Sequence, residues 1–152
     1  RGRLWQARHD AYWAGMALKP GHTPMTTDAI VPVSRLADLV LGAQADIAAS
    51  GFTAPIVGHV GDGNFHIAYL IDPKIPSERD TAERLNSELV QRAIDAQGTC
   101  SGEHGIGMSK MAYIEFEQSA ELIALQKRLK SAFDPKGLLN PGKIFPTGHR
   151  GC

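Results

Sequence analysis

The spacing of apolar residues predicts two long helices in the middle of the chain. The first lies between Ser34, a residue type that commonly caps helix N-termini, and Gly51, which ends it; its apolar side consists of Leu36, Leu39, Val40, Ala43 and Ile47. The second lies between Ser77 and Gly98, and its apolar side consists of Ala82, Leu85, Leu89, Ala93 and Ile94. Each helix therefore has one face to bury against another layer.

Helical spacing also appears near both ends of the chain. The opening segment, "RLWQARHDAYWAGMAL", carries apolar residues at helical spacing and is closed by Pro20 and Gly21. A last helix is expected from about Ser119, with Leu122, Leu125, Leu129 and Phe133 on one side. The glycine-rich "GIGMSK" precedes that helix, and the extended "DPKGLLNPGKIFP" follows it.

Four short apolar runs, at 26–33, 55–60, 65–71 and 99–101, predict strands. With the two central helices they give the order β-α-β-β-α-β, which is that of the ferredoxin-like fold. We therefore expect an α+β protein with an antiparallel sheet, helices on one face of it, and a C-terminal helical tail. Residues 1–115 would form the sheet domain with its entry helix, and 116–152 a tail too short to have its own core.

The stretch "HVGDGNFH", at 59–66, joins the two middle strands. Asp62-Gly63 is a strong signal for a two-residue hairpin loop, because both loop residues need positive φ. Such a loop would pair His59 directly with His66, with their Cβ atoms roughly 4.5–5.5 Å apart on one face. The two imidazoles would then be able to hold a single ion.

Composition narrows the classes of partner. The 152 residues include 16 basic and 16 acidic side chains, so no net charge favours nucleic acid or an anionic membrane. No apolar run approaches the roughly 18 residues that a membrane helix needs. Cys100 and Cys152 form no disulfide framework, which favours a reducing compartment. Because the chain opens at Arg1 inside a predicted helix, we expect it to be part of a longer protein.

A carboxylate and a third imidazole follow the last predicted strand, in "SGEHGIG". Glu103 with His59 and His66 forms a donor set that suits Zn²⁺, Mn²⁺ or Fe²⁺ and leaves positions open for substrate or water. Neighbouring residues on a regular strand point to opposite faces, so Glu103 and His104 can share a site only where the strand has ended. The surrounding glycines make that ending plausible.

Plainer interpretations compete with this one. Two histidines on a hairpin are commonly a surface feature, and Arg8 has the spacing of a solvated helix charge. Asn140 and Lys143, in "NPGK", have the character of a turn, while His9, His22 and His149 are expected at the surface. The glycines of "GDGNFH" lie between strands with no helix after them, which argues against a dinucleotide-binding loop.

Three motifs together resemble one family. "HVGDGNFH", "GTCSGEHGIGMSK" and "DPKGLLNPGKIFP", in this order, are similar to the C-terminal domain of FAD-linked oxidases. That flavoprotein group includes D-lactate dehydrogenases of the cytochrome type and the FAD subunit of glycolate oxidase, and the opening segment resembles the former most. The resemblance covers essentially the whole chain and implies FAD, bound mainly by an N-terminal domain that this sequence does not contain.

The resemblance also implies roles for single residues. His59, His66 and Glu103 match the family's ligands for a divalent metal, expected to be Zn²⁺ or Mn²⁺. His104 matches the catalytic base, Arg8 the residue that binds the substrate carboxylate, and Asn140 a segment that contacts the flavin.

The same resemblance bears on the substrate. Where the 2-hydroxyglutarate enzymes of the group carry an Asn and a Lys, this chain has Ala68 and Thr26, which favours a monocarboxylate such as D-lactate. The expected partners are a small 2-hydroxyacid and an external electron acceptor (cytochrome c, a quinone or an electron-transfer flavoprotein), with no nucleic acid and with a homodimer as one assembly. The expected location is cytoplasmic, with a peripheral position at the inner membrane as an option.

Two other functions remain open from the residues alone. The same His-His-Glu set would serve a free-standing metallohydrolase or Fe²⁺ oxygenase, which activity without flavin would establish. A non-catalytic binding module on a ferredoxin-like sheet is the third, and ligand binding by the metal-free protein would favour it.

Overall fold

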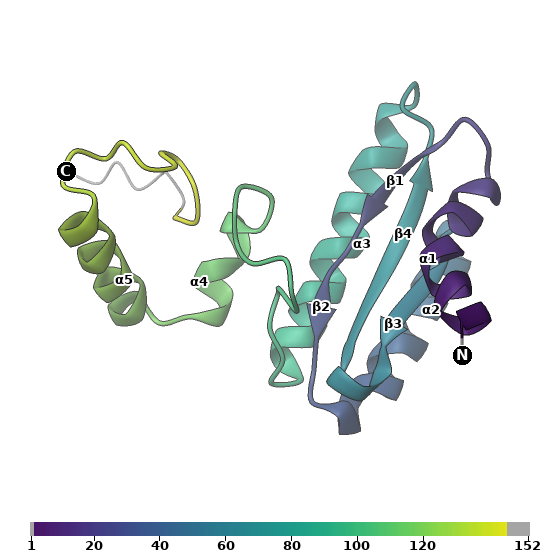
Figure 1. Ribbon diagram of the computed structural model, residues 1–152, viewed down its shortest axis with the longest axis horizontal. Coiled ribbons are helices and arrows are strands. Elements are labelled where there is room, and N and C mark those ends of the chain that lie inside the picture. Colours follow the sequence, from purple (N-terminus) through teal and green to yellow (C-terminus); the bar gives the residue numbers. More distant parts are fainter. Residues whose placement is uncertain (1, 146–152) are drawn as a thin grey trace.

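The computed structural model describes residues 2–145 (Figure 1). Its helices are α1 (Gly2–Ala17), α2 (Leu36–Ser50), α3 (Pro76–Asp95), α4 (Ile114–Glu117) and α5 (Ala120–Phe133). Its strands are β1 (Thr23–Thr26), β2 (Ala29–Ile30), β3 (Ile56–His59) and β4 (Asn64–Ile71). Short 3-10 turns lie at Val33–Arg35, Val60–Asp62 and Met111–Tyr113.

Strand β4 is the centre of an antiparallel sheet. β1 and β2 pair with one side of it in a single continuous register, from Thr23 opposite Ile71 to Ile30 opposite Asn64, and β3 pairs with its other side. The predicted strand at 26–33 is therefore one interrupted strand that starts earlier, at Thr23. The predicted strand at 99–101 is wrong as a strand, because Thr99 makes only an isolated bridge with Ile30.

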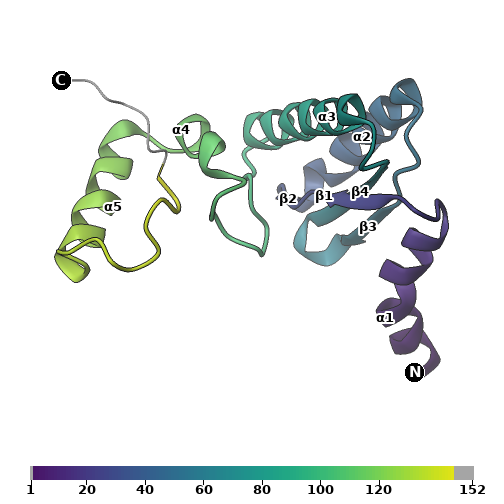
Figure 2. The ribbon, with the colours of Figure 1, turned by 90° about the horizontal axis from the view of Figure 1, so that it is seen from above.

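Two helices cover one face of the sheet, as the α+β prediction required. Figure 2 shows α2 and α3 along one side of the strands. The side chains that alternate along β4 toward these helices, Phe65, Ile67, Tyr69 and Ile71, are buried in one cluster with Leu36, Leu39, Ala43, Ala82, Leu85, Leu89 and Ala93. The apolar sides predicted for both helices belong to this core, Val40 and Ile47 as partly buried members, with the exception of Ile94.

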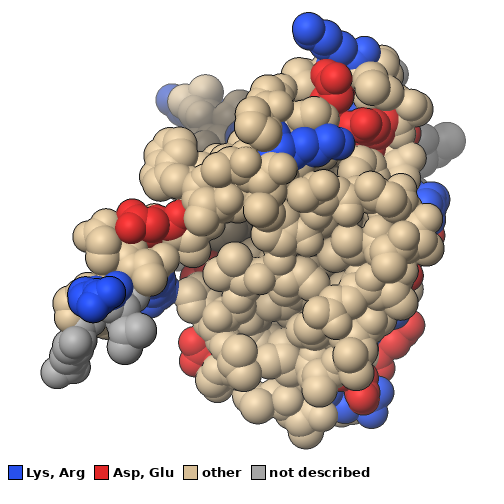
Figure 3. Space-filling view, turned by 90° about the vertical axis from the view of Figure 1, so that its right-hand side faces the viewer, with Lys and Arg blue, Asp and Glu red and all other residues tan. Residues whose placement is uncertain are grey.

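Helix α1 projects from the other side of the sheet (Figure 2). Its C-terminal part approaches the segment before β3, since a Cβ at Gly15 would lie 3.3 Å from Cγ of Pro55. Trp5 and Trp13 of this helix are 52% and 70% exposed. Figure 3 looks onto the side of the molecule where α1, α2 and β3 lie, and shows a broad uncharged surface with Lys, Arg, Asp and Glu at its margins.

The helix boundaries correct two predicted caps. Ser34 lies inside a 3-10 turn, and no side chain caps α2. Ser77 is not a cap either, because α3 already begins at Pro76, whose fixed φ suits the first helical position. The stop at Gly51 is confirmed by its left-handed φ of 73°, and the cap at Ser119 is confirmed by a hydrogen bond that its side chain accepts from the backbone N–H of Leu122.

The C-terminal part continues through α4 and α5 into an extended tail. Glu117 joins α4 to the sheet domain, since its Oε2 accepts hydrogen bonds from Thr99 Oγ1 at 2.9 Å and from the backbone N–H of Cys100 at 2.8 Å. Phe133, the last residue of α5, is 84% exposed, and Leu138, in the tail that follows, is 72% exposed. Residues 146–152 of the predicted tail, with His149 and Cys152, lie outside the described residues.

Candidate metal centre

The β3–β4 hairpin brings His59 and His66 to one face of the sheet, but not in direct opposition. His59 lies opposite Asn64, and His66 lies opposite Val57. The predicted two-residue loop is wrong: a 3-10 turn at Val60–Asp62 followed by the left-handed Gly63 makes the connection longer. Because the register shifts by two residues, the side-chain parity is kept, and the two ring centroids lie 5.7 Å apart.

Glu103 completes a three-ligand group. Its Oε1 lies 2.9 Å from His66 Nε2 and 3.9 Å from His59 Nε2. One ligand atom from each of the three residues lies within 4.8 Å of the others. Ligand atoms that share a Zn²⁺ ion lie roughly 3–4 Å apart when each bond is about 2.0–2.2 Å long. The donor types and their spacing therefore fit a divalent cation after small side-chain movements.

A hydrogen bond to the backbone of Thr27 fixes the orientation of the His66 ring. Its Nδ1 lies 2.9 Å from the backbone carbonyl oxygen of Thr27, which can only accept a hydrogen bond. Nδ1 therefore carries a hydrogen, and Nε2, the atom that faces Glu103, is the ring nitrogen left to bind a metal. In the sheet, the backbone N–H of Ile67 would normally donate to the carbonyl oxygen of Thr27. Here it donates to the Thr27 hydroxyl oxygen instead, at 2.9 Å. This exchange explains the interruption between β1 and β2.

His104 lies beside the three ligands and is stacked on one of them. Its ring is nearly parallel to that of His66, with an angle of 12° between the planes and 5.5 Å between the centroids. His104 Nε2 lies 3.6 Å from Glu103 Oε1, and the side chain is 56% exposed. The chain has left the sheet after Thr99, so Glu103 and His104 can both face the cluster, as the glycines around them suggested.

Asp28 is a site residue that the sequence did not reveal. Its side chain is 1% exposed, and its Oδ2 accepts hydrogen bonds from Lys110 Nζ at 2.9 Å and from the backbone N–H of His104 at 3.1 Å and of Glu103 at 3.3 Å. Burial on its own raises the pKa of this carboxyl, but these hydrogen bonds outweigh burial and hold the pKa well below its usual range. Asp28 is therefore a buried anion behind the ligand loop.

A contact between Asn64 and Gly102 also shapes the site. Asn64 is buried at the start of β4, and a Cβ at Gly102 would lie 2.7 Å from its Cγ. The loop passes so close to the sheet that position 102 has no room for a side chain. Glycine here permits a close approach of two chain segments.

The structure does not bring Arg8 or Asn140 to this cluster. Arg8 is exposed on α1, where its guanidinium carbon lies 5.6 Å from the centre of the Trp5 ring. Asn140 is exposed in a turn of the tail with φ of 47°, and its side chain makes no hydrogen bond within the described residues.

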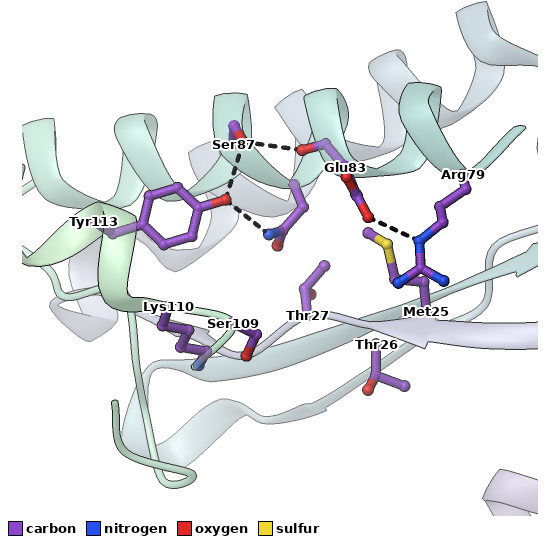
Figure 4. A pocket seen from close by; sticks show the side chains of 10 residues that line it. Met25, Thr26, Thr27, Arg79, Glu83, Ser87, Ser109, Lys110 and Tyr113 are labelled. Atoms are coloured by element: carbon purple, nitrogen blue, oxygen red, sulfur yellow. Dashed lines mark hydrogen bonds and ion pairs between the residues drawn. The ribbon is translucent and has the colours of Figure 1, made fainter. Parts of the chain in front are cut away.

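A cavity of about 430 Å³ lies beside the cluster rather than over it. Figure 4 shows it between α3 and β1, with the Tyr113 hydroxyl turned toward Ser87 and with Lys110 at its inner end. Thr26 points away from α3 in this view, toward the opposite face of the sheet. The cavity and the histidine cluster are thus separated by the interrupted strand.

The arrangement offers a definite chemistry. Two imidazole nitrogens and one carboxylate oxygen supply three ligands on a surface that solvent reaches, since Glu103 is 49% exposed. A fourth polar group, His104, lies beside them, with Nδ1 3.7 Å from Asp28 Oδ2, and an exposed imidazole of this kind can exchange a proton with a bound molecule. A set of three such donors with open positions is of the kind found in catalytic rather than closed structural metal sites.

None of the described helices is both long enough and apolar enough to cross a bilayer.

Comparison with known proteins places the chain in a family. The model of the C-terminal domain of FAD-linked oxidases matches residues 1–144. A probable mitochondrial D-lactate dehydrogenase of Danio rerio is 45% identical over 145 residues, which cover 95% of this chain and 29% of the relative. A mitochondrial D-lactate dehydrogenase (cytochrome) of Arabidopsis thaliana is 43% identical over 94% of this chain and 25% of its own length.

A glycolate oxidase subunit of Bacillus subtilis is 40% identical over 97% of this chain and 31% of its own length. The chain thus spans about a quarter to a third of the curated relatives it matches. The chain belongs to the family of C-terminal domains of FAD-linked oxidases.

Proposed function

We propose that this chain is the substrate- and metal-binding part of an FAD-dependent dehydrogenase that oxidises a D-2-hydroxyacid to the 2-oxoacid. The observation that carries the proposal is the convergence of His59, His66 and Glu103, with His104 stacked beside them, in a chain of this family. Relatives named D-lactate dehydrogenase and glycolate oxidase both act, by their names, on small 2-hydroxyacids, which supports the substrate class.

In this proposal three residues bind a metal and a fourth transfers a proton. The divalent cation, Zn²⁺ or Mn²⁺, would be held by His59 and His66, each through Nε2, and by Glu103 through Oε1. A cation bound there supplies Lewis acidity, which lowers the pKa of a substrate hydroxyl. His104 has an exposed ring next to that position and would accept the hydroxyl proton as general base, a role typically worth about 10²–10⁴-fold in rate.

Arg8 is the proposed partner of the substrate carboxylate. A guanidinium binds a carboxylate through two parallel, charge-assisted hydrogen bonds, and within the described residues Arg8 is not paired with any acid. Arg8 stands on α1, which lies on the side of the sheet away from α2 and α3. His59 and His66 face that same side, and this supports the role proposed for Arg8.

A monocarboxylate is the favoured substrate. Thr26 and Ala68 lie opposite each other in the pairing of β1 with β4. Neither carries a charge or a strong donor that would bind a second, distal carboxylate, so the open face near the cluster suits lactate better than a dicarboxylic acid.

The flavin and the acceptor would be supplied by other parts of the enzyme. The flavin takes the electrons released from the substrate, and an external acceptor (cytochrome c, a quinone or an electron-transfer flavoprotein) would reoxidise it. We propose that 116–145 and the residues after them, in which Phe133 and Leu138 are largely exposed, pack on the FAD-binding domain, with Asn140 near the flavin. A homodimer and a cytoplasmic location at the inner membrane stay predictions; two relatives are named mitochondrial.

The test uses the natural protein that contains this chain. We expect His66→Ala and His59→Ala to lose bound metal in elemental analysis and D-lactate oxidation while the visible FAD absorbance is retained. His22→Ala is the matched control, because His22 lies in the exposed turn that follows α1. An active, metal-free His59→Ala/His66→Ala enzyme would refute the proposal, and metal-dependent hydrolysis without FAD would support the metallohydrolase instead.

A further inference from the structure

Asp28 collects an unusual number of donors on one atom. Its Oδ2 accepts hydrogen bonds from Ser101 Oγ at 3.2 Å, from the N–H groups of Glu103 and His104 at 3.3 and 3.1 Å, and from Lys110 Nζ at 2.9 Å. Lys110 Nζ also donates to the backbone carbonyl of Asp28 at 3.0 Å. A single buried carboxylate therefore holds both ends of the loop that carries Glu103 and His104.

The sheet itself gives this loop little support. Thr99 makes the last bridge to a strand, and the chain after Cys100 runs outside the sheet. The four donors of the Asp28 carboxylate all belong to the segment 101–110, far along the chain from position 28. Hydrogen bonds to a charged acceptor are about twice as strong as neutral ones, so this contact dominates the local anchoring.

Asp28 also stands next to the metal ligands on the sheet. The continuous register of β1 and β2 with β4 places Asp28 opposite His66, so both side chains share one face. Asp28 Oδ1, which has no hydrogen-bond partner, lies 3.9 Å from His66 Nδ1. The carboxylate is thus in contact with the strand that presents one ligand and with the loop that presents another.

We propose that Asp28 is the positioning residue of this site: it fixes Glu103 and His104 at the distance from His66 that metal binding and proton transfer require. This inference rests on the proposed function, because it assigns a role toward the same metal site. Lys110 is the counterion that keeps the buried carboxylate charged, and removing it alone weakens the same anchor.

The test compares variants of the natural protein after metal removal. Asp28→Asn keeps the shape of the side chain and removes its charge, while Asp62→Asn makes the same change on an exposed acid in the hairpin turn. The first readout is the dissociation constant for Zn²⁺, measured by competition with a chelating dye. We expect Asp28→Asn to raise it about 10- to 100-fold and Asp62→Asn to leave it unchanged.

A second readout separates positioning from a loss of stability. Visible absorption of the Co²⁺-loaded protein reports the ligands and their geometry, which a merely destabilised but folded site would keep. We expect an altered Co²⁺ spectrum for Asp28→Asn at a temperature at which circular dichroism shows it folded. An unchanged spectrum with an unchanged Zn²⁺ dissociation constant would overturn the proposal.

A third variant keeps the test decisive if Asp28→Asn does not fold. Lys110→Gln retains a donor without the charge, and we expect a smaller shift in the same direction for both readouts; no shift in either would overturn the inference. His66→Ala separates the two proposals. If it loses Zn²⁺ binding while Asp28→Asn and Lys110→Gln keep it, only the positioning role fails; if it binds Zn²⁺ as the wild type does, both proposals fail.

Discussion

The carbonyl oxygen of Thr27 accepts a hydrogen bond from His66 Nδ1 at 2.9 Å, across two neighbouring strands. A backbone carbonyl in this position would ordinarily accept from the N–H of the facing residue, Ile67. Here the Thr27 hydroxyl accepts from that N–H instead, so the buried donor is satisfied while the carbonyl turns to the imidazole. One threonine thus supports both the sheet and the orientation of a metal ligand.

Replacing Thr27 should separate these two roles. Thr27→Val keeps the shape but leaves the buried N–H of Ile67 without a partner, which should lower the free energy of unfolding by about 1–3 kcal/mol. Thr27→Ser keeps the hydroxyl and should lose less. Thr26→Val, at the exposed neighbouring position, is the control and should stay within about 0.5 kcal/mol of wild type in urea unfolding. Equal effects of the two valine variants would contradict this account.

A side chain at position 102 should push the ligand loop away from the sheet. In Gly102→Ala the new Cβ would meet the Asn64 amide group at 2.7–2.8 Å, and Asn64 is too well buried to withdraw freely. We expect Zn²⁺ affinity to fall by about tenfold, the scale of changes around metal ligands. Gly107→Ala, whose Cβ would meet nothing within 4 Å, should bind Zn²⁺ as the wild type does. Similar affinities for all three proteins would argue against the close approach.

The start of the tail should loosen in acid. Asp134 accepts a hydrogen bond from Lys130 and further ones from the N–H groups of Leu139 and Leu138, both at 2.9 Å; these contacts lower its pKa to about 2. Because the folded pKa lies below the unfolded value, the stabilisation is complete above about pH 4 and is lost as the pH falls through 2. Hydrogen exchange at the amides of 138 and 139 should therefore lose protection over that range.

Asp134→Asn should lose part of that protection already at neutral pH, because the amide has one acceptor atom where the carboxylate has two. Asp95→Asn, which changes an exposed acid at the end of α3, is the matched control and should leave the exchange of these amides unaltered. Protection that does not depend on pH in the wild type would show that the carboxylate is not the anchor.

Cys100 should be an unreactive thiol. Burial, together with the Glu117 carboxylate that contacts it, raises the pKa of Cys100 to about 11. At pH 8 its thiolate fraction is then about 100-fold below that of an ordinary thiol. Because alkylation requires the thiolate, the reaction should be slow. In a Cys152→Ser background, iodoacetamide labelling followed by mass spectrometry should be slow in the folded protein and ordinary in urea. Glu117→Gln should accelerate labelling; rapid labelling of Cys100 in the folded Cys152→Ser protein would exclude this environment.

The two central helices and the middle hairpin strands were predictable because each depends on local pattern, whereas the strand expected at 99–101 was not formed. The apolar sides of α2 and α3 follow from spacing alone, and Gly51 ends α2 in the conformation that glycine favours. The hairpin register was not predictable, because a distant contact decides it: the N–H of Val31 donates to the carbonyl of Gly63 at 3.0 Å, and a Cβ at Gly63 would meet Val31 O at 2.0 Å. That contact selects the longer turn over the two-residue loop.

The prediction that His59 and His66 share one face of the sheet is confirmed although the predicted loop is wrong. A shift by two residues leaves side-chain parity unchanged, so His59 and His66 still share a face, whereas a shift by one would have separated them. Asp28 could not be identified from the sequence, because an acid within an apolar run resembles an exposed strand position. Its hydrogen-bond donors lie far along the chain, at 101–110. The roles assigned to Arg8 and Asn140 came from family resemblance alone and stay predictions.

The bridge between Thr99 and Ile30 is the last pairing of this segment with the sheet. Residues 101–109, which carry Glu103 and His104, therefore lie outside the strands, while His59 and His66 belong to the hairpin. A loop of another length or charge at 101–109 would change what faces the two imidazoles without altering the strand pairing, provided that its main-chain amides still reach the buried acid at position 28.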